Sequence, residues 1–401
     1  MFTALPRISQ VSRIRAVAVL VGLVLAAALT PMTAVRASSS VLTAATPRHL
    51  LAKLSGASAG DQFGDAIAVS STTAVIGADG AGSNAGAAYI YTRTSLGWNT
   101  TPTAVLHGVT AGDEFGVSVA ISGATVAIGA QGRNSGTGAV YLYTETASGW
   151  ETTPTAVFNG PHAQEQFGSA VALSKGGLLV GTGNYAAYLF AETSNGWNKA
   201  PTAVFYPVGC SFEGFGNAVA LEGKYAVVGA PSTGTCSEAY IYTKASAGWN
   251  TAPTVILADK STYSVFGAFL AMSGTTLVVG AVFQNNNNGA AFVFTRGAAG
   301  WATTPALAVH GDKGSELGKS VTILGGRVGV GAINNLYGNG VGAAYEFVKS
   351  QSGWDSKPAL VLHSFVAGDD FGYSMALSTG TVFVGAPAFN PLSGAVYIFS
   401  S

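Results

Sequence analysis

The chain repeats one short pattern, and this repeat limits the folds that it can adopt. A phenylalanine-glycine pair, with a second glycine fourteen residues after the phenylalanine, occurs in seven copies at intervals of 48 to 54 residues, with leucine in place of phenylalanine in one of them. The pairs are Phe63-Gly64, Phe115-Gly116, Phe167-Gly168, Phe215-Gly216, Phe266-Gly267, Leu317-Gly318 and Phe371-Gly372. A unit of this length cannot bury its own apolar face, so the period predicts a solenoid or a propeller.

Apolar residues alternate with period two within each unit, which is the pattern of β-strands. In the first copy we expect strands over residues 63–70, 73–78, 87–92 and 102–107. Short links rich in Gly, Asn, Asp and Ser separate them, as turn geometry favours. Seven four-stranded units predict an all-β fold, a seven-bladed β-propeller of four-stranded antiparallel blades.

The seventh copy lacks its fourth strand, because the sequence stops just after the third. Residues 46–54 (TPRHLLAKL) resemble residues 101–108 (TPTAVLHG), which precede the second phenylalanine-glycine pair. We therefore expect an N-terminal strand to complete the last blade and close the ring, with Leu50 or Leu51 and Leu54 in the core. Closure removes the sheet edges that would invite aggregation.

Residues 1–37 have the pattern of a signal peptide. Arg7, Arg13 and Arg15 precede an apolar stretch over residues 16–29, and Val35-Arg36-Ala37 offers small residues for cleavage. The apolar stretch is shorter than the ~20 residues of a spanning helix. We expect residues 38–401 to form a single propeller domain that is secreted, extracellular or associated with the cell surface, with no membrane span after signal removal.

The charge of the predicted mature chain argues against nucleic acid as a partner. Residues 38–401 carry 15 basic and 19 acidic side chains, a net charge of −4. Phosphate recognition needs a concentrated basic face instead. We expect a monomer.

The copies at residues 63–98 and 115–150 resemble the FG-GAP repeat of integrin α-subunit propellers and of exported bacterial proteins, with the bacterial variety the closer. The resemblance covers about 350 residues. It implies a seven-bladed propeller and a role in recognition or cell adhesion. Calcium-binding members have an Asp-rich loop between the first two strands, whereas these links are short and poor in carboxylates here. We therefore expect no metal and no cofactor.

No pattern of catalytic residues stands out, and we expect a non-catalytic protein. His107, His310 and His363 occupy one position of the fourth strand, which we align with Phe158 and Phe205 and interpret as structural. An acidic residue stands two positions before five of the seven pairs, at Asp61, Asp113, Glu165, Glu213 and Asp369. We interpret these acids as turn caps, with a cation-attracting ring at the channel mouth as the alternative.

The two cysteines belong to links of one blade that emerge on the same face. Cys210 precedes the fourth pair and Cys236 follows its second strand. Because export favours oxidation, we expect a disulfide between them rather than free thiols.

That face is also where we expect a ligand, because variable loops on a rigid scaffold commonly carry recognition. Its larger side chains are Arg133, Tyr185, Phe212, Tyr263, Phe283, Tyr337 and Phe389. The leading hypothesis is an exported module that binds a protein or a glycan there. The alternatives are a propeller-type hydrolase or lyase, and a purely structural surface module.

Overall fold

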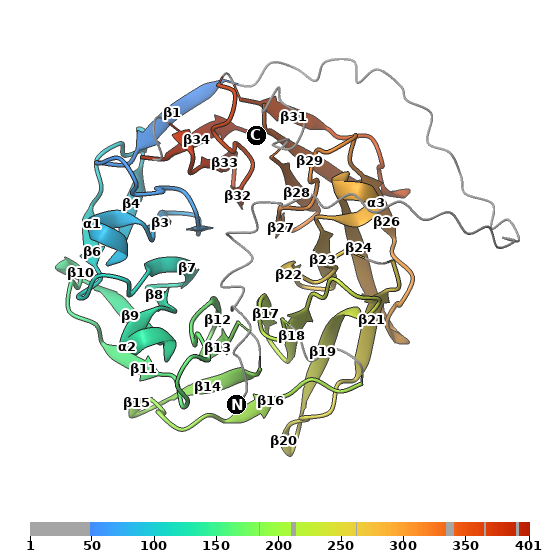
Figure 1. The fold of residues 1–401 in the computed structure, drawn as a ribbon, viewed down its shortest axis with the longest axis horizontal. Coiled ribbons are helices and arrows are strands. Elements are labelled where there is room, and N and C mark those ends of the chain that lie inside the picture. Colours follow the sequence, from blue (N-terminus) through green and yellow to red (C-terminus); the bar gives the residue numbers. More distant parts are fainter. Residues whose placement is uncertain are drawn as a thin grey trace, which may run out of the picture. The chain divides into compact units, whose positions relative to one another are not determined.

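The computed structural model describes residues 49–183, 185–209, 214–261, 263–333, 341–364, 366–389 and 393–401. Residues 45–401 form one compact unit. Seven antiparallel sheets follow one another around a ring in chain order, as Figure 1 shows. The predicted seven-bladed β-propeller is therefore confirmed. The predicted signal peptide, residues 1–37, lies outside the described residues.

The first three blades are formed by consecutive strands. Blade 1 contains β2 (Ile67–Val69), β3 (Thr73–Ala78), β4 (Ala87–Thr94), β5 (Gly97–Trp98) and β6 (Ala104–His107). Blade 2 contains β7 (Phe115–Ser122), β8 (Thr125–Ala130), β9 (Ala139–Thr146), β10 (Gly149–Trp150) and β11 (Ala156–Asn159). Blade 3 contains β12 (Ala170–Ser174), β13 (Gly177–Gly181), β14 (Ala187–Thr193), β15 (Gly196–Trp197) and β16 (Ala203–Phe205).

The next three blades repeat this arrangement. Blade 4 contains β17 (Val219–Glu222), β18 (Tyr225–Ala230), β19 (Ser237–Ala245), β20 (Gly248–Trp249) and β21 (Val255–Asp259). Blade 5 contains β22 (Phe269–Ser273), β23 (Thr276–Ala281), β24 (Ala290–Gly297), β25 (Gly300–Trp301) and β26 (Leu307–His310). Blade 6 contains β27 (Ser320–Leu324), β28 (Arg327–Ala332), β29 (Ala343–Ser350), β30 (Gly353–Trp354) and β31 (Leu360–His363).

Blade 7 joins the two ends of the described chain. It contains β32 (Ser374–Ser378), β33 (Thr381–Ala386), β34 (Ala395–Ser400) and the N-terminal β1 (Leu50–Ser55). β1 pairs antiparallel with β34, with Leu54 opposite Val396, so the predicted ring closure is confirmed.

The burial of β1 differs in part from the prediction. Leu54 is buried in the core between blades 7 and 1, as expected. Leu50 and Leu51, however, are 46% and 55% exposed. The ladder shifts register between Leu50 and Ala52, and Ala52 packs against the core instead. The expectation that one of the two leucines enters the core is therefore wrong.

The first strand of every blade except blade 2 is shorter than the pattern predicted. In blade 1 the pair Phe63-Gly64 precedes β2 rather than beginning it, and Gly64 has a φ of +97° that leaves the regular ladder. Phe63 is nevertheless fully buried and meets Tyr89 of β4 edge to face, with ring centroids 5.2 Å apart. The repeated phenylalanine is thus a core residue, but in most blades it lies just outside the strand that was expected to contain it.

The two glycines of the repeat meet across neighbouring blades, which explains why the period contains both. A Cβ atom added to Gly77 of blade 1 would overlap the carbonyl oxygen of Gly116 in blade 2. The same approach occurs at every joint of the ring, ending with Gly385 of blade 7 against Gly64 of blade 1. The absence of a side chain lets the backbones pack this closely.

The tryptophans pack at the outer rim and bridge neighbouring blades. Trp98 of blade 1 contacts Phe383 of blade 7, with centroids 4.9 Å apart and the rings perpendicular. Three others likewise reach back to the preceding blade, in the pairs Trp197 and Phe158, Trp249 and Phe205, and Trp301 and Tyr225. Each is therefore part of an inter-blade joint.

The histidines of the fourth strand do not align with the phenylalanines, contrary to our alignment. In register, His107 faces Ala87 and is exposed, whereas Phe158 faces Val140 and is buried. Phe158 corresponds to Leu106, one residue earlier than His107. A shift of one residue moves a side chain to the opposite face of a strand, so His107, His310 and His363 point away from the core.

Candidate functional site

The links between the second and third strands, and those between blades, emerge on one face of the ring, which we call the link face. The residue before each phenylalanine-glycine pair has a left-handed conformation in all seven blades. These residues are Gln62, Glu114, Gln166, Gly214, Val265, Glu316 and Asp370. Six of them are not glycine, and Val265 is β-branched, so the link is held in a conformation that such residues rarely adopt.

Three of the five acids two positions before the pairs cap these links, as we predicted, whereas Glu165 contacts the side chains of His162 and Tyr188 instead. Asp61 accepts a hydrogen bond from the backbone of Ser58 at 2.8 Å, and Asp113 accepts one from Thr110 at 3.2 Å. Asp369 accepts hydrogen bonds from the Ser364 hydroxyl and from the backbone of Phe371. Glu213 lies outside the described residues.

Three links on this face form the same tight turn. α1 (Ala81–Asn84), α2 (Arg133–Gly136) and α3 (Gln284–Asn287) each contain two central residues in left-handed conformation. In α3 these are Asn285 and Asn286. Asparagine tolerates this conformation better than most residues, so the asparagine-rich stretch is explained by turn geometry.

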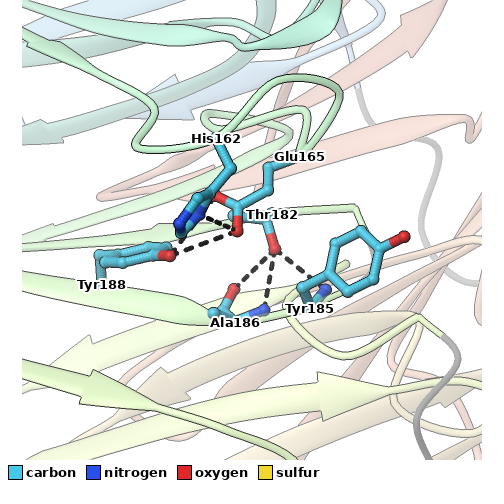
Figure 2. A network of polar contacts seen from close by, with 6 residues as sticks. All are labelled: His162, Glu165, Thr182, Tyr185, Ala186 and Tyr188. Carbon is cyan, nitrogen blue, oxygen red and sulfur yellow. Dashed lines mark hydrogen bonds and ion pairs between the residues drawn. The ribbon is translucent and has the colours of Figure 1, made fainter.

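Blade 3 has the shortest of these links, and a threonine hydroxyl organises it (Figure 2). Thr182 Oγ1 accepts hydrogen bonds from the backbone of Tyr185 at 3.1 Å and of Ala186 at 2.9 Å, and donates one to the Ala186 carbonyl. The other blades have alanine at the position of Thr182. The turn leaves the Tyr185 ring 58% exposed and pointing away from the network.

Further exposed apolar side chains lie in the links of blades 3 and 4, and we call Tyr185, Tyr206, Val208 and Tyr263 the tyrosine patch. Register pairs Ala187 with Phe205, which places Tyr206 beside the turn that carries Tyr185. The Tyr240 hydroxyl donates to the Val208 carbonyl at 2.8 Å. This hydrogen bond attaches the link between β16 and β17, which carries Tyr206 and Val208, to blade 4.

Tyr263 extends the patch over blade 4. Its backbone donates to the carbonyl of Thr233, in the link between β18 and β19, at 3.2 Å. The exposed fractions are 57% for Tyr206, 40% for Val208 and 67% for Tyr263. A surface of this kind is typical of an interaction site.

A polar network lies behind the patch. Glu165 accepts from Tyr188 and pairs with His162, whose Nδ1 lies 2.9 Å from Glu165 Oε1. Burial, and then the carboxylate of Glu165, raises the pKa of the Tyr188 phenol. The phenol therefore stays protonated and donates to Glu165, which holds the link behind Tyr185 in place.

The structure places the other predicted ligand residues in supporting roles. Arg133 lies over the Tyr141 ring, at 5.2 Å from its centroid. Phe283 packs against a small buried cluster that includes Val265, and Phe389 lies beneath the Lys53 ammonium at 3.4 Å. Phe212, Tyr337 and Cys210 lie outside the described residues.

Sequence reasoning missed a charged cluster near the axis of the ring, in the residues that follow the phenylalanine-glycine pairs of blades 6, 7 and 1. Lys319 is only 9% exposed, and its ammonium lies 3.9 Å from the Tyr373 ring centroid. Asp65, Glu316 and Asp370 all act on Lys319 electrostatically. Burial lowers the pKa of Lys319 and raises that of Asp65 to about 6. An alignment of the seven copies at the residue after the glycine of each pair could have revealed this charged cluster.

A second acidic residue next to this cluster, Asp79, has a pKa that burial and the neighbouring carboxylates of Asp65 and Glu114 raise well above its usual range. Glu114 in turn accepts a hydrogen bond from the Gln131 amide at 2.8 Å. Within the described ranges, no three His, Cys, Asp or Glu side chains are grouped closely enough to hold a metal ion.

The FG-GAP repeat family matches the chain four times, over residues 48–91, 98–143, 249–294 and 357–399. These matches fall on blades 1, 2, 5 and 7 and on strands adjoining them. Among curated proteins, none matches the chain closely enough to count as a relative. In the part of the chain that the structure describes, no helix is long and apolar enough to cross a membrane.

Proposed function

We propose that this FG-GAP repeat protein is an exported, non-catalytic recognition or adhesion module that binds a protein or a glycan through its link face. The observation that carries the proposal is the tyrosine patch. Large rings that are apolar on their faces and polar at one end are enriched where proteins meet ligands. The ring of blades provides a rigid support, and the Thr182 turn and the Glu165 network fix the position of Tyr185.

A binding experiment tests the proposal directly. The protein without residues 1–37 is applied to a glycan array and to a pull-down from a surface proteome, and each ligand found is titrated. Substituting Tyr185, Tyr206 and Tyr263 with alanine should weaken binding by at least tenfold, which corresponds to about 1.4 kcal/mol.

Leu96 supplies the matched control. It is 98% exposed in the hairpin between β4 and β5, which emerges on the opposite face. Leu96→Ala should leave binding unchanged. Equal losses in this variant and in the tyrosine variants would place recognition elsewhere.

The cluster around Lys319 favours a second candidate, a hydrolase or lyase. A carboxyl with a raised pKa beside a buried ammonium is an arrangement that catalytic sites use. Incubation with a panel of glycans should then give product that Asp65→Asn abolishes. Binding without turnover would favour the recognition module.

A further inference from the structure

Positive charge is concentrated on the face opposite the link face, which we call the hairpin face. In each blade it contains the turn between the first two strands, with its flanking residues, and the segment from the end of the third strand to the fourth. In blades 3 to 6 these segments carry seven basic and three acidic side chains, a net charge of +4, apart from Arg327, which buried Glu346 compensates. The basic side chains are Lys175, Lys199, Lys224, Lys244, Arg296, Lys349 and Lys357, and the acidic ones are Glu192, Glu222 and Asp355.

Six of these seven cations are exposed lysines, and we call them the lysine arc: Lys175, Lys199, Lys224, Lys244, Lys349 and Lys357. None of the six is paired with an acid in the part of the chain that the structure describes. Arg296 differs from them, because it is half-buried and lies 5.0 Å from the Tyr225 ring centroid. The arc is therefore a set of solvated charges that no ion pair within the fold uses.

The rest of the chain does not share this charge. In blades 1 and 2 the same segments carry only Arg93, Glu145 and Glu151. Residues 38–401 as a whole have a net charge of −4, so the hairpin face of four consecutive blades reverses the sign of the whole chain. A local field of this kind attracts oppositely charged partners to one surface.

We propose that the lysine arc binds an acidic polysaccharide. A lysine ammonium is a point charge without the planar fork of arginine, so several of them suit a partner with repeated negative charges rather than one bidentate anion. Exposed amide and hydroxyl side chains lie in the same segments and can hydrogen-bond sugar hydroxyls. They include Asn195, Thr251, Thr304 and Gln351.

Other polyanions fit this face less well. A flat anionic bilayer would also meet the acids Glu145 and Glu151 of blade 2, whereas a chain can follow blades 3 to 6 alone. Single-stranded nucleic acid is bound through aromatic stacking as well as charge, and no aromatic side chain of blades 3 to 6 is exposed on the hairpin face in the described chain. A duplex needs a more concentrated basic face, and here three exposed acids lie among the lysines.

The experiment is a calorimetric titration of the whole protein with polygalacturonate and with its fully methyl-esterified form, which has the same backbone without the charges. We expect polygalacturonate to bind and the ester to bind at least tenfold more weakly. Binding that depends on released counterions falls as salt rises, so the affinity should drop about tenfold or more between about 50 and about 200 mM salt.

Variants of the arc test its position, and because the altered side chains are exposed, we expect their unfolding to match that of the parent. The triple variant Lys175→Gln, Lys224→Gln and Lys244→Gln should weaken polygalacturonate at least tenfold. Glu222→Gln removes an acid beside Lys224 and should tighten binding severalfold. Lys260→Gln is the matched control, since Lys260 is an exposed lysine of the link face, and it should change nothing.

Equal binding of the methyl ester, an unaltered affinity in the triple variant, or an equal loss in Lys260→Gln would each overturn the proposal. Tighter binding of phosphatidylglycerol vesicles or of an oligonucleotide than of polygalacturonate would overturn the assignment to a polysaccharide. The inference is independent of the tyrosine patch: replacing Tyr185, Tyr206 and Tyr263 with alanine should leave polygalacturonate binding intact, so the two proposals can fail separately.

Discussion

At the scale of single residues, the close approach of paired glycines makes a sharp prediction. Gly229 lies against the Gly267 carbonyl of the next blade, so an added methyl group must displace backbone. Gly229→Ala should lower the free energy of unfolding by about 3 kcal/mol, as overpacking does. Urea denaturation followed by tryptophan fluorescence measures the change.

Gly297 is the matched control for this substitution. It also has an ordinary φ, but nothing lies near the position of its Cβ. Gly297→Ala should therefore be neutral or slightly stabilising, by up to about 1 kcal/mol. Equal effects at the two glycines would mean that the joint does not depend on the missing side chain.

The Asp65 carboxyl gives the stability of the fold an unusual pH dependence. Its folded-state pKa of about 6 lies above its ordinary value of 3.8 because burial disfavours the charge. The folded state therefore binds this proton more tightly than the unfolded state does. The contribution of Asp65 to stability declines as the pH rises from about 4 to about 6, by up to about 3 kcal/mol.

Asp65→Asn removes this titration, so the variant should gain stability relative to the parent as the pH rises from 4 to 7. Urea unfolding at several pH values between these limits measures the difference. Asp355→Asn, at an exposed acid, should show no such gain. A constant difference between Asp65→Asn and the parent across this range would contradict the assignment.

At the scale of elements, the joint between blades 6 and 7 differs from the others. Trp301 of blade 5 contacts Tyr225 at the start of β18, and Arg327 occupies the equivalent position in blade 6. Blade 7 has no Gly-Trp strand among the described residues. Arg327 instead forms two 2.8 Å hydrogen bonds with buried Glu346 and donates to the Ser378 carbonyl of blade 7.

A pair of variants measures what this ion pair contributes. Glu346→Ile leaves Arg327 without its carboxylate and should cost about 3 kcal/mol or more. Adding Arg327→Thr gives blade 6 the residues that blade 1 has at Ile90 and Thr73, and should recover most of the loss. Thermal or urea unfolding measures the stability of both variants. A double variant less stable than the single one would show that the charges are essential at this joint.

The expected disulfide between Cys210 and Cys236 also belongs to this scale, since it would link two turns of one face. In the chain-entropy model such a loop stabilises the fold by roughly 3 to 4 kcal/mol. Intact-mass measurement after alkylation should show no modified thiol without reductant and two with it. Two modified thiols in the unreduced protein would contradict the pairing.

At the scale of the whole molecule, closure by β1 rests on one buried leucine. Leu54→Ala should cost about 2–5 kcal/mol, as for a buried leucine in a core. Leu51→Ala, at an exposed position three residues earlier in the same strand, should cost less than about 0.5 kcal/mol. A chain that starts at Ser55 should aggregate through the uncovered edge of β34. If both leucine variants unfold alike, the observed register of β1 is wrong.

The number of blades and the closure of the ring could be predicted because every unit repeats the same contacts. The glycine at the position of Gly77 therefore recurs in seven copies, and the residues at the positions of Phe63 and Trp98 recur in six copies each. The cluster of Asp65, Lys319 and Tyr373 could not be found in this way, since its members come from three blades and differ in type. The exposure of Leu51 also escaped prediction, because it depends on a local shift of register that strand alternation does not reveal.

The pairing of the first described strand with the last has a consequence for how the molecule folds. The His49 backbone N–H donates a hydrogen bond to the Ser400 hydroxyl, 351 residues further along the chain. During synthesis β1 emerges before blades 1 to 6 and has no partner until β34 has been made. Bringing such distant segments together costs more loop entropy than any pairing within a blade. Blades 1 to 6 can form as the ribosome advances, whereas blade 7 must wait until β34 has been synthesised and is expected to be the slow, last step of folding.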